Sequence, residues 1–356
     1  MVTQSQITDL IAGTLSTRPV KLTDISQAGG ITKYRILSEI WQKHKMKLTG
    51  GNKIEFDLDY IPNDSTQASS LYDEDKISVN NTLTTGELPF RFIKQHWAYD
   101  VRESFLNGKP EQIINVIENR RRKSLIGAHI FAEDKGWGFT PATDSENMFG
   151  LQNFIVPKTG AAEDVGYNSA LPTGYSTIAG IDPTVATRWK SGTGIYSAFT
   201  SADLVWKLYE MFYMLGYAPP VQSSMVSNQK PQYMLATTLD VINNLNQMVE
   251  GKAYQTAKTN KVSLFDGVVT YKGVLFEAVD KLTQVDRALT TQEMPIFVID
   301  WTTWKFYHFN KNIINETPPT NKNTGSHNTF AGWLDIMGNF ACTDITRNGC
   351  LTKATS

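Results

Sequence analysis

Two groups of charged side chains have the types and spacing for chemistry, and the first is acidic. Its members lie between residues 55 and 75 and are Glu55, Asp57, Asp59, Asp64, Asp73, Glu74 and Asp75. Carboxylates gathered in this way could hold a calcium ion, although the order of ligands matches no EF-hand loop. Because the first three alternate strictly with apolar residues, we favour a strand with one solvated, acidic face.

The second group is the basic run Arg120, Arg121, Arg122 and Lys123. These residues could grip a phosphate, but four consecutive positions point all round a helix and cannot form one patch. We therefore interpret them as solvated or ion-paired side chains. Arg121 falls on the apolar side of its helix, so it needs an acidic partner, and the acidic strand face supplies candidates.

Other signatures of catalysis are incomplete. The histidines, His44, His96, His129, His308 and His327, share no close metal-ligand spacing. Residues 174–178 do not form GxSxG, and Gly192-Thr193-Gly194 is not extended to a nucleotide-binding loop. The sequence therefore predicts no enzyme, with no catalytic residue, metal or cofactor. A hydrolase with a carboxylate site in the loops is the competing interpretation.

Composition narrows the class of protein. The chain has 356 residues, 34 Lys plus Arg against 35 acids, and a formal charge of -1, so it lacks the basic footprint of a nucleic-acid reader. Cys342 and Cys350 form no CxxC, which favours a reduced protein without a zinc site. No apolar run approaches the roughly 18 residues of a membrane span.

A long helix must carry the basic run. Pro110 suits a first helical position and Gly136 closes the pattern, which predicts a helix over about 110–135, roughly 37 Å long. One 120° arc of this helix is apolar and should be buried, and it comprises Ile113, Ile114, Ile117, Leu125, Ala128, Phe131 and Ala132. Val116, Ile126 and Ile130 lie outside the arc and suggest a second packed face.

A two-stranded loop must carry the acidic run. Ile54, Phe56, Leu58 and Tyr60 alternate with the acids, and a strand returns at Leu88, Phe90 and Phe92 after a polar span. Residues 1–30 read as an extended arm, and 31–48 as a helix. We expect the loop and the arm to bury few side chains within one chain.

The remaining elements indicate an α+β class. Residues 136–194 read as loop with brief strands such as 154–156. Two helices follow, one capped by Thr200 or Ser201 and ending at Gly216, the other capped by Thr237 or Thr238 and ending at Gly251. Strands are expected at 262–269, 274–279, 296–299, 304–309 and 333–341.

Several strings in this order resemble the major capsid protein of tailed bacteriophages. They are Gly150-Leu151 leading to residues 154–156, the run 177–183 reaching Trp189, residues 296–300 through 307–310, and Gly338-Asn339 to 347–349. The resemblance implies an N-terminal arm with a short helix (1–50), an extended β-hairpin loop (51–97) and a peripheral domain with a long spine helix (98–150). An axial domain begins at 151–260, and residues 261–356 supply shared strands and a C-terminal tail.

The resemblance also implies a function. Such a protein assembles with itself into pentamers and hexamers of an icosahedral shell around double-stranded DNA, which it binds without sequence specificity. It is formed in the host cytoplasm and resides in the virion, with no membrane. The implied partners are a portal, a separate scaffolding protein, because only a short arm follows Met1, and in some assemblies a decoration protein. An encapsulin-like compartment is the rival with the same fold.

One contact follows from the resemblance. In this family the extended loop overlies the neighbouring subunit, so Glu55, Asp57 and Asp59 are predicted to approach basic residues of the next copy. Arg120, Arg121, Arg122 and Lys123 are the leading candidates for those basic residues. Charge pairs of this kind fix register more than they add stability.

Overall fold

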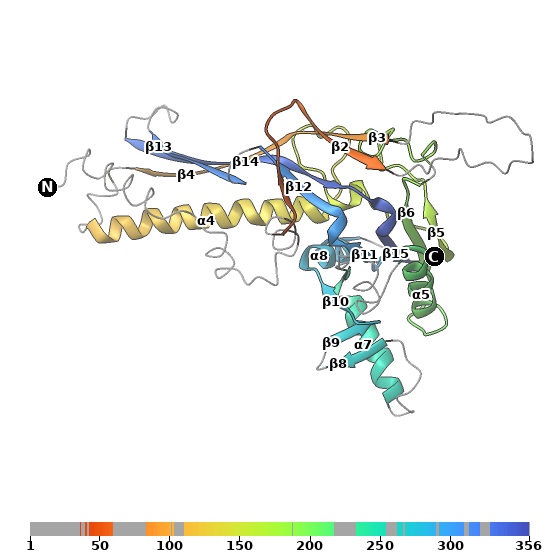
Figure 1. Cartoon of the computed structure of the whole chain (residues 1–356). Coiled ribbons are helices and arrows are strands. Elements are labelled where there is room, and N and C mark those ends of the chain that lie inside the picture. Colours follow the sequence, from red (N-terminus) through yellow and green to blue (C-terminus); the bar gives the residue numbers. More distant parts are fainter. Residues whose placement is uncertain are drawn as a thin grey trace, which may run out of the picture.

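A computed structural model describes most of the chain, in which helices and strands are mixed (Figure 1). The described residues are 36, 40, 43–59, 83–100, 102, 110–186, 188–216, 233–253, 262–265, 268–289, 292–309, 313–320 and 328–355. They form a five-stranded sheet, an eight-stranded sheet and a two-stranded hairpin. This agrees with the expected mixture of helices and strands. The predicted arm, residues 1–30, lies outside the described residues.

The longest helix is α4, which spans Pro110–Trp137 and confirms the helix predicted from Pro110 (Figure 1). Ile117, Leu125, Ala128 and Ala132 are buried as expected. Gly136 lies inside the helix, where an added Cβ would come within 2.9 Å of the Ile36 side chain. The helix continues two residues past its predicted end at about 135, and Gly136 allows the close approach of these two segments.

Two expectations about the faces of α4 are wrong. Phe131 is 40% exposed although it lies in the predicted apolar arc, and Ile130 is 42% exposed although a second packed face was expected there. His129 and Glu133 are buried instead, because the packed side extends towards Trp137. The helix therefore packs along one broad side and leaves Ile130 and Phe131 at the surface.

The five-stranded sheet is built around the long strand β14, Thr329–Cys342. β4 (Arg91–Asp100) and β12 (Trp304–His308) pair with successive parts of β14, while β13 (Ile314–Thr320) pairs antiparallel with β14 and ends the sheet. Pro318 and Pro319 occupy a register shift in β13. Prolines are confined to such edge positions because they cannot donate to a ladder.

Helix α4 lies along β4. The Arg120 Nη1 donates to the carbonyl oxygen of Ala98 at 3.2 Å, and the Ser124 hydroxyl donates to that of His96 at 3.2 Å. Side chains of the helix thus satisfy carbonyl groups of the strand, which fixes the helix against the sheet.

Strand β1, Lys45–Lys47, completes this sheet by pairing parallel to β12. The helix predicted over 31–48 is therefore wrong at its C-terminal end, since Lys45–Lys47 is extended. Tyr34, Leu37 and Trp41, on which that prediction rested, lie outside the described residues. Three residues are too few to show an alternating pattern, and their strand forms because β12 offers a free edge.

The eight-stranded sheet has the order β5-β6-β15-β11-β7-β10-β9-β8. Its strands are β5 (Glu163–Asn168), β6 (Ser191–Tyr196), β7 (Tyr233–Thr237), β8 (Val262–Phe265), β9 (Val268–Tyr271), β10 (Val274–Ala278), β11 (Ile296–Asp300) and β15 (Gly349–Lys353). The strand predicted over 262–269 is thus a hairpin of two strands. Short 3-10 helices in the described part of the chain include Leu151–Asn153, Trp301–Thr303 and Ile345–Arg347.

Helices cover both faces of the eight-stranded sheet. α5 (Leu204–Met214) and α7 (Leu239–Ala253) share one core cluster with Ile296 and Val298 of β11. Phe297 and Ile299 belong to the other cluster, together with Leu282 of α8 (Asp280–Ala288). Since alternate residues of a strand face opposite ways, α5 and α8 lie on opposite faces of the sheet. Figure 1 shows β11 and β15 between them.

Both helices expected between 200 and 251 are present, but one cap differs. Asp203, not Thr200 or Ser201, precedes α5, and its carboxylate accepts the N–H groups of Ser197 and Ala198 at 2.7 Å. Thr238 caps α7 as predicted, because its hydroxyl accepts from the Val241 N–H at 3.4 Å. Residues 154–156 are not a strand; Phe154 and Ile155 are buried after the turn of Leu151–Asn153.

Candidate assembly interface

The predicted extended loop begins as a hairpin of β2, Lys53–Asp59, and β3, Leu83–Pro89. Residues 60–82, which include Tyr60 and four of the acidic candidates, lie outside the described residues. The hairpin ends earlier than predicted, because Pro89 closes β3 and Arg91 starts β4 in the five-stranded sheet. Phe92, expected on the returning strand, is 53% exposed on β4.

The inner side of the hairpin packs against the chain's own core. Ile54, Phe56, Leu58 and Leu88 are at most 6% exposed, and the Phe56 ring stacks on Tyr307 with centroids 6.2 Å apart. Gly86 faces the Phe56 ring so closely that an added Cβ would come within 2.6 Å of it. The expectation that this segment buries few side chains within one chain is therefore wrong for β2 and β3.

Two hydrogen bonds from distant segments hold β3. The N–H of Glu87 donates to the carbonyl oxygen of Ala179 at 2.8 Å, and the Asn339 Nδ2 donates to that of Pro89 at 3.0 Å. Ala179 and Gly180 form a turn with φ values of 52° and 81°. A non-glycine residue at positive φ is uncommon, so this turn is held by its surroundings.

The outer side of the hairpin is acidic. Glu55 and Asp57 are exposed, and Glu55 lies directly opposite Glu87 in the register of the two strands. The Lys53 Nζ lies 2.6 Å from the Glu87 carboxylate, and this hydrogen bond raises the pKa of the lysine. Like charges directly opposite one another are unfavourable, so this face favours a basic partner. Asp59 is the last residue of β2.

The four residues of the basic run differ in exposure because they point in different directions from α4. Arg121 makes a bidentate ion pair with Glu316 of β13, in which Nε lies 2.6 Å from Oε1, and the two side chains are 11% and 20% exposed. Its partner is therefore within the chain and is not the acidic strand face, which corrects the candidate named from sequence. Arg122 and Lys123 are exposed, whereas Arg120 is half-buried against β4.

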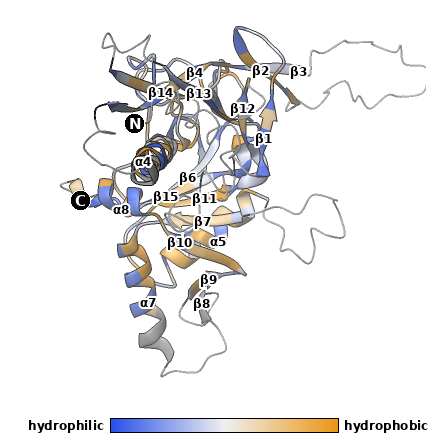
Figure 2. Ribbon diagram, turned by 90° about the vertical axis from the view of Figure 1, so that its left-hand side faces the viewer, coloured by the Kyte–Doolittle hydropathy of each residue, from blue (hydrophilic) through white to orange (hydrophobic). Residues whose placement is uncertain are grey.

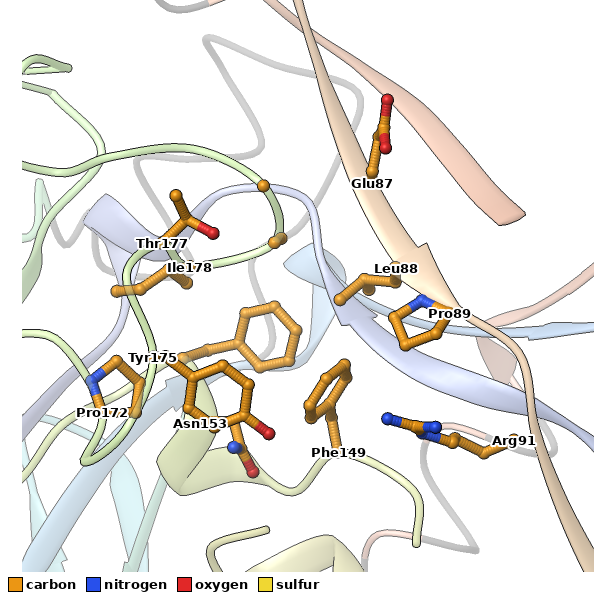
Figure 3. A pocket seen from close by; sticks show the side chains of 13 residues that line it. Glu87, Leu88, Pro89, Arg91, Phe149, Asn153, Pro172, Tyr175, Thr177 and Ile178 are labelled. Carbon is orange, nitrogen blue, oxygen red and sulfur yellow. The ribbon is translucent and has the colours of Figure 1, made fainter. Parts of the chain in front are cut away.

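A cavity of about 260 Å³ lies where the hairpin meets the loop before Ile181 (Figure 3). Leu88, Pro89, Phe149 and Tyr175 give it a largely apolar lining. The Arg91 guanidinium lies 5.7 Å from the centre of the Phe149 ring, and its Nη1 donates to the carbonyl oxygen of Ser145. This arrangement joins β4 to the loop by packing.

His129 and both cysteines are buried in the interior. His129 is buried with Nδ1 2.6 Å from the Leu125 carbonyl oxygen, and burial lowers the pKa of its imidazole. Cys342 and Cys350 are buried, and burial raises the pKa of both thiols. Across the described ranges no three His, Cys, Asp or Glu side chains come together as a metal site. No helix there is long and apolar enough to span a membrane.

Comparison with models of protein families found no match, and comparison with curated proteins found none. Among solved structures, the chain is similar to the cyanophage A-1(L) capsid asymmetric unit at 13% identity and a TM-score of 0.57, covering 91% of this chain and 94% of that chain. An encapsulin complex from Synechococcus elongatus matches at 10% identity and a TM-score of 0.48, covering 94% of this chain and 96% of that chain. The capsid of a native GTA particle matches at 9% identity and a TM-score of 0.49, covering 95% of this chain and 93% of that chain.

At 13% identity the cyanophage likeness establishes the fold alone. The chain has the phage capsid-protein fold that the order of its sequence elements predicted. The likeness covers most of both chains.

Proposed function

We propose that the chain is a major capsid protein of a tailed phage, which assembles into pentamers and hexamers of an icosahedral shell around double-stranded DNA. The observation that carries this proposal is the shared fold, which extends over 91% of the chain. The protein then works as a structural protein of the virion and not as an enzyme. The arm, extended loop, peripheral and axial domains assigned from sequence belong to the same proposal.

The outer face of the hairpin supports contact between copies. Its inner face is already packed, so Glu55 and Asp57 are presented outwards on a fixed base. Arg122 and Lys123 are presented outwards on α4. We propose that these two acids, with Asp59, meet Arg122 and Lys123 of the next copy. Arg120 and Arg121 stabilise their own chain, through the Ala98 carbonyl and Glu316 respectively.

The overall charge supports a wall that encloses DNA without gripping it. A formal charge of -1 over 356 residues supplies little non-specific attraction for phosphates. Strong attraction would hold the genome against the shell and oppose its release. A portal, a separate scaffolding protein and a decoration protein are partners that such a shell would use.

Electron microscopy of the purified protein tests the proposal directly. Closed icosahedral shells, or ring-shaped pentamers and hexamers, are the expected result. Shells that contain a co-purified enzyme and no nuclease-protected DNA would favour the encapsulin-like alternative. A protein that stays monomeric and shows metal-dependent hydrolysis would overturn the capsid assignment and favour the hydrolase.

A further inference from the structure

Helix α5 presents an aromatic surface to solvent. Its inner side is buried, whereas Tyr213 is 82% exposed and Trp206 is 52% exposed, with Tyr209 half-buried between them. The spacing of three, four and seven residues places the three rings on one side of the helix. We call Trp206, Tyr209 and Tyr213 the α5 face.

Contacts with neighbouring side chains hold the rings of Trp206 and Tyr209 in the α5 face. The Trp206 Nε1 donates to the Glu210 carboxylate at 2.7 Å, and the rings of Trp206 and Tyr209 stack with centroids 5.7 Å apart. The Lys272 Nζ lies 4.2 Å from the centre of the Tyr209 ring. Because the indole N–H already has an acceptor on its own helix, covering the ring leaves no unsatisfied donor. Ring stacking also limits the side-chain freedom that binding would remove.

A second set of exposed apolar side chains is carried by α4 and α8, which an ion pair joins. The Lys281 Nζ and the Asp134 Oδ2 join the two helices at 3.2 Å. Ile130 and Phe131 lie one turn before Asp134, and Val285 lies one turn after Lys281, followed one turn later by Leu289. These four side chains are between 40% and 47% exposed. We call Ile130, Phe131, Val285 and Leu289 the α4–α8 face.

The two surfaces lie on opposite sides of the eight-stranded sheet. Helix α5 shares its core with Ile296, Val298 and Leu351, whereas Leu282 of α8 belongs to the cluster of Phe297 and Ile299. In Figure 2, which colours the chain by hydropathy, α8 lies on the side of the sheet near α4, away from α5. One lobe of the molecule therefore carries two different apolar surfaces facing away from each other.

We infer that the α5 face of one copy packs against the α4–α8 face of the next copy. Two different surfaces on one body make a head-to-tail contact, which continues from copy to copy and closes into a ring when the rotation from one copy to the next divides a full turn. Contact between two α5 faces would instead stop at a dimer. This inference rests on the proposed function, because a pentamer or hexamer needs such a repeating contact.

The α5 face would supply part of the area of such an interface. A stable interface buries about 800 Å² on each partner. An aromatic side chain buries about 150–250 Å², so the exposed parts of Trp206 and Tyr213 would supply roughly 250 Å² of that area. Trp and Tyr also dominate the binding energy of many interfaces. The remaining area must come from the surfaces around these two rings.

Cross-linking tests the pairing. We would prepare Tyr213→Cys, Val285→Cys and the double variant, and treat assembled protein with a short bismaleimide; Cys342 and Cys350 are buried and should not react. Neither single variant should cross-link alone, an equal mixture of the two should give dimers, and the double variant should give a ladder up to the ring. Cross-linking of Tyr213→Cys alone would overturn the head-to-tail arrangement.

A second pair of variants measures assembly. Trp206→Ala with Tyr213→Ala should reduce ring formation in sizing chromatography at least tenfold, while Val185→Ala, which changes another highly exposed apolar residue, should assemble as the wild type does. Unchanged circular dichroism of the α5 variant would exclude unfolding as the cause. Wild-type shells without the predicted cross-links would overturn this inference alone. A protein that forms no particles and no cross-links would overturn both proposals.

Discussion

The Asn339 side chain on β14 holds the carbonyl oxygen of Pro89 at the point where β3 ends, with 3.0 Å between Nδ2 and that oxygen. Its Oδ1 accepts the N–H of Phe149 at 2.9 Å, so one fully buried amide joins the central strand, the hairpin and the loop after α4. Neither backbone group is on the same strand as Asn339. This side chain therefore helps to fix the position of the acidic hairpin, together with the Ala179 contact and the packed inner face.

Asn339→Ala should lower the free energy of unfolding by about 1–3 kcal/mol, because it leaves buried backbone groups without a partner. Urea unfolding of the unassembled chain measures this difference. Hydrogen exchange should also become faster in β3. Asn315→Ala on the exposed side of β13 is the matched control and should change stability by less than about 0.5 kcal/mol. Equal effects of the two variants would contradict the role given to Asn339.

Removal of Arg121 should be more costly than removal of its neighbour. Arg121→Met leaves the Glu316 carboxylate, 20% exposed, without its bidentate partner, and we expect a loss of about 2–3 kcal/mol. Arg122→Met removes an exposed charge and should cost less than about 0.5 kcal/mol. Thermal unfolding compares the two variants. The double variant Arg121→Met with Glu316→Leu should regain much of the loss, and failure to do so would show that the pair contributes more than mutual neutralisation.

Charge reversal tests the contact proposed between copies. Glu55→Lys with Asp57→Lys should slow or prevent shell formation while leaving the fold of the unassembled chain intact, because both side chains are exposed. Adding Arg122→Glu and Lys123→Glu should restore assembly. Light scattering during assembly provides the measurement. Restoration of assembly by the Arg122→Glu and Lys123→Glu changes would identify the partner surface, provided that Lys94→Glu, at an exposed position of β4, does not restore it.

His129 should make stability depend on pH. Burial lowers the pKa of the imidazole in the folded chain below its ordinary value of 6.5, so the unfolded chain binds the proton first as pH falls. Its contribution to stability is therefore present above pH 6.5 and is lost as pH decreases through the lowered folded pKa. His129→Gln should reduce the slope of unfolding free energy against pH in this range. An unchanged slope would assign the dependence to other groups.

The sequence allowed some elements to be predicted because they carry a repeated pattern. Ile54, Phe56 and Leu58 alternate with acids, and the long run after Pro110 lacks a breaker, so β2 and α4 follow from local spacing. β1 and β13 were missed because one has three residues and the other contains two prolines. These strands form through pairing with distant partners, which no local period records.

The sequence predicted that Arg121 needs an acidic partner, but it did not identify which residue that partner is. The position of Arg121 on the apolar side of α4 indicated a buried charge that needs an acid, and the structure places one there. Glu316, however, is 195 residues away, and its approach depends on the pairing of β13 with β14. The alternation predicted a buried face for β2, but that this face is buried within its own chain was missed for the same reason, since Tyr307 comes from another part of the chain.

The prolines of β13, which ends the five-stranded sheet, have a consequence at high protein concentration. Pro318 and Pro319 remove two amide donors from β13, and the shift in register there bends the strand. A newly made copy that arrives alongside β13 is hindered from extending the ladder at this edge. High local concentration, which closed particles require, would then favour surface-to-surface docking over amyloid-like stacking.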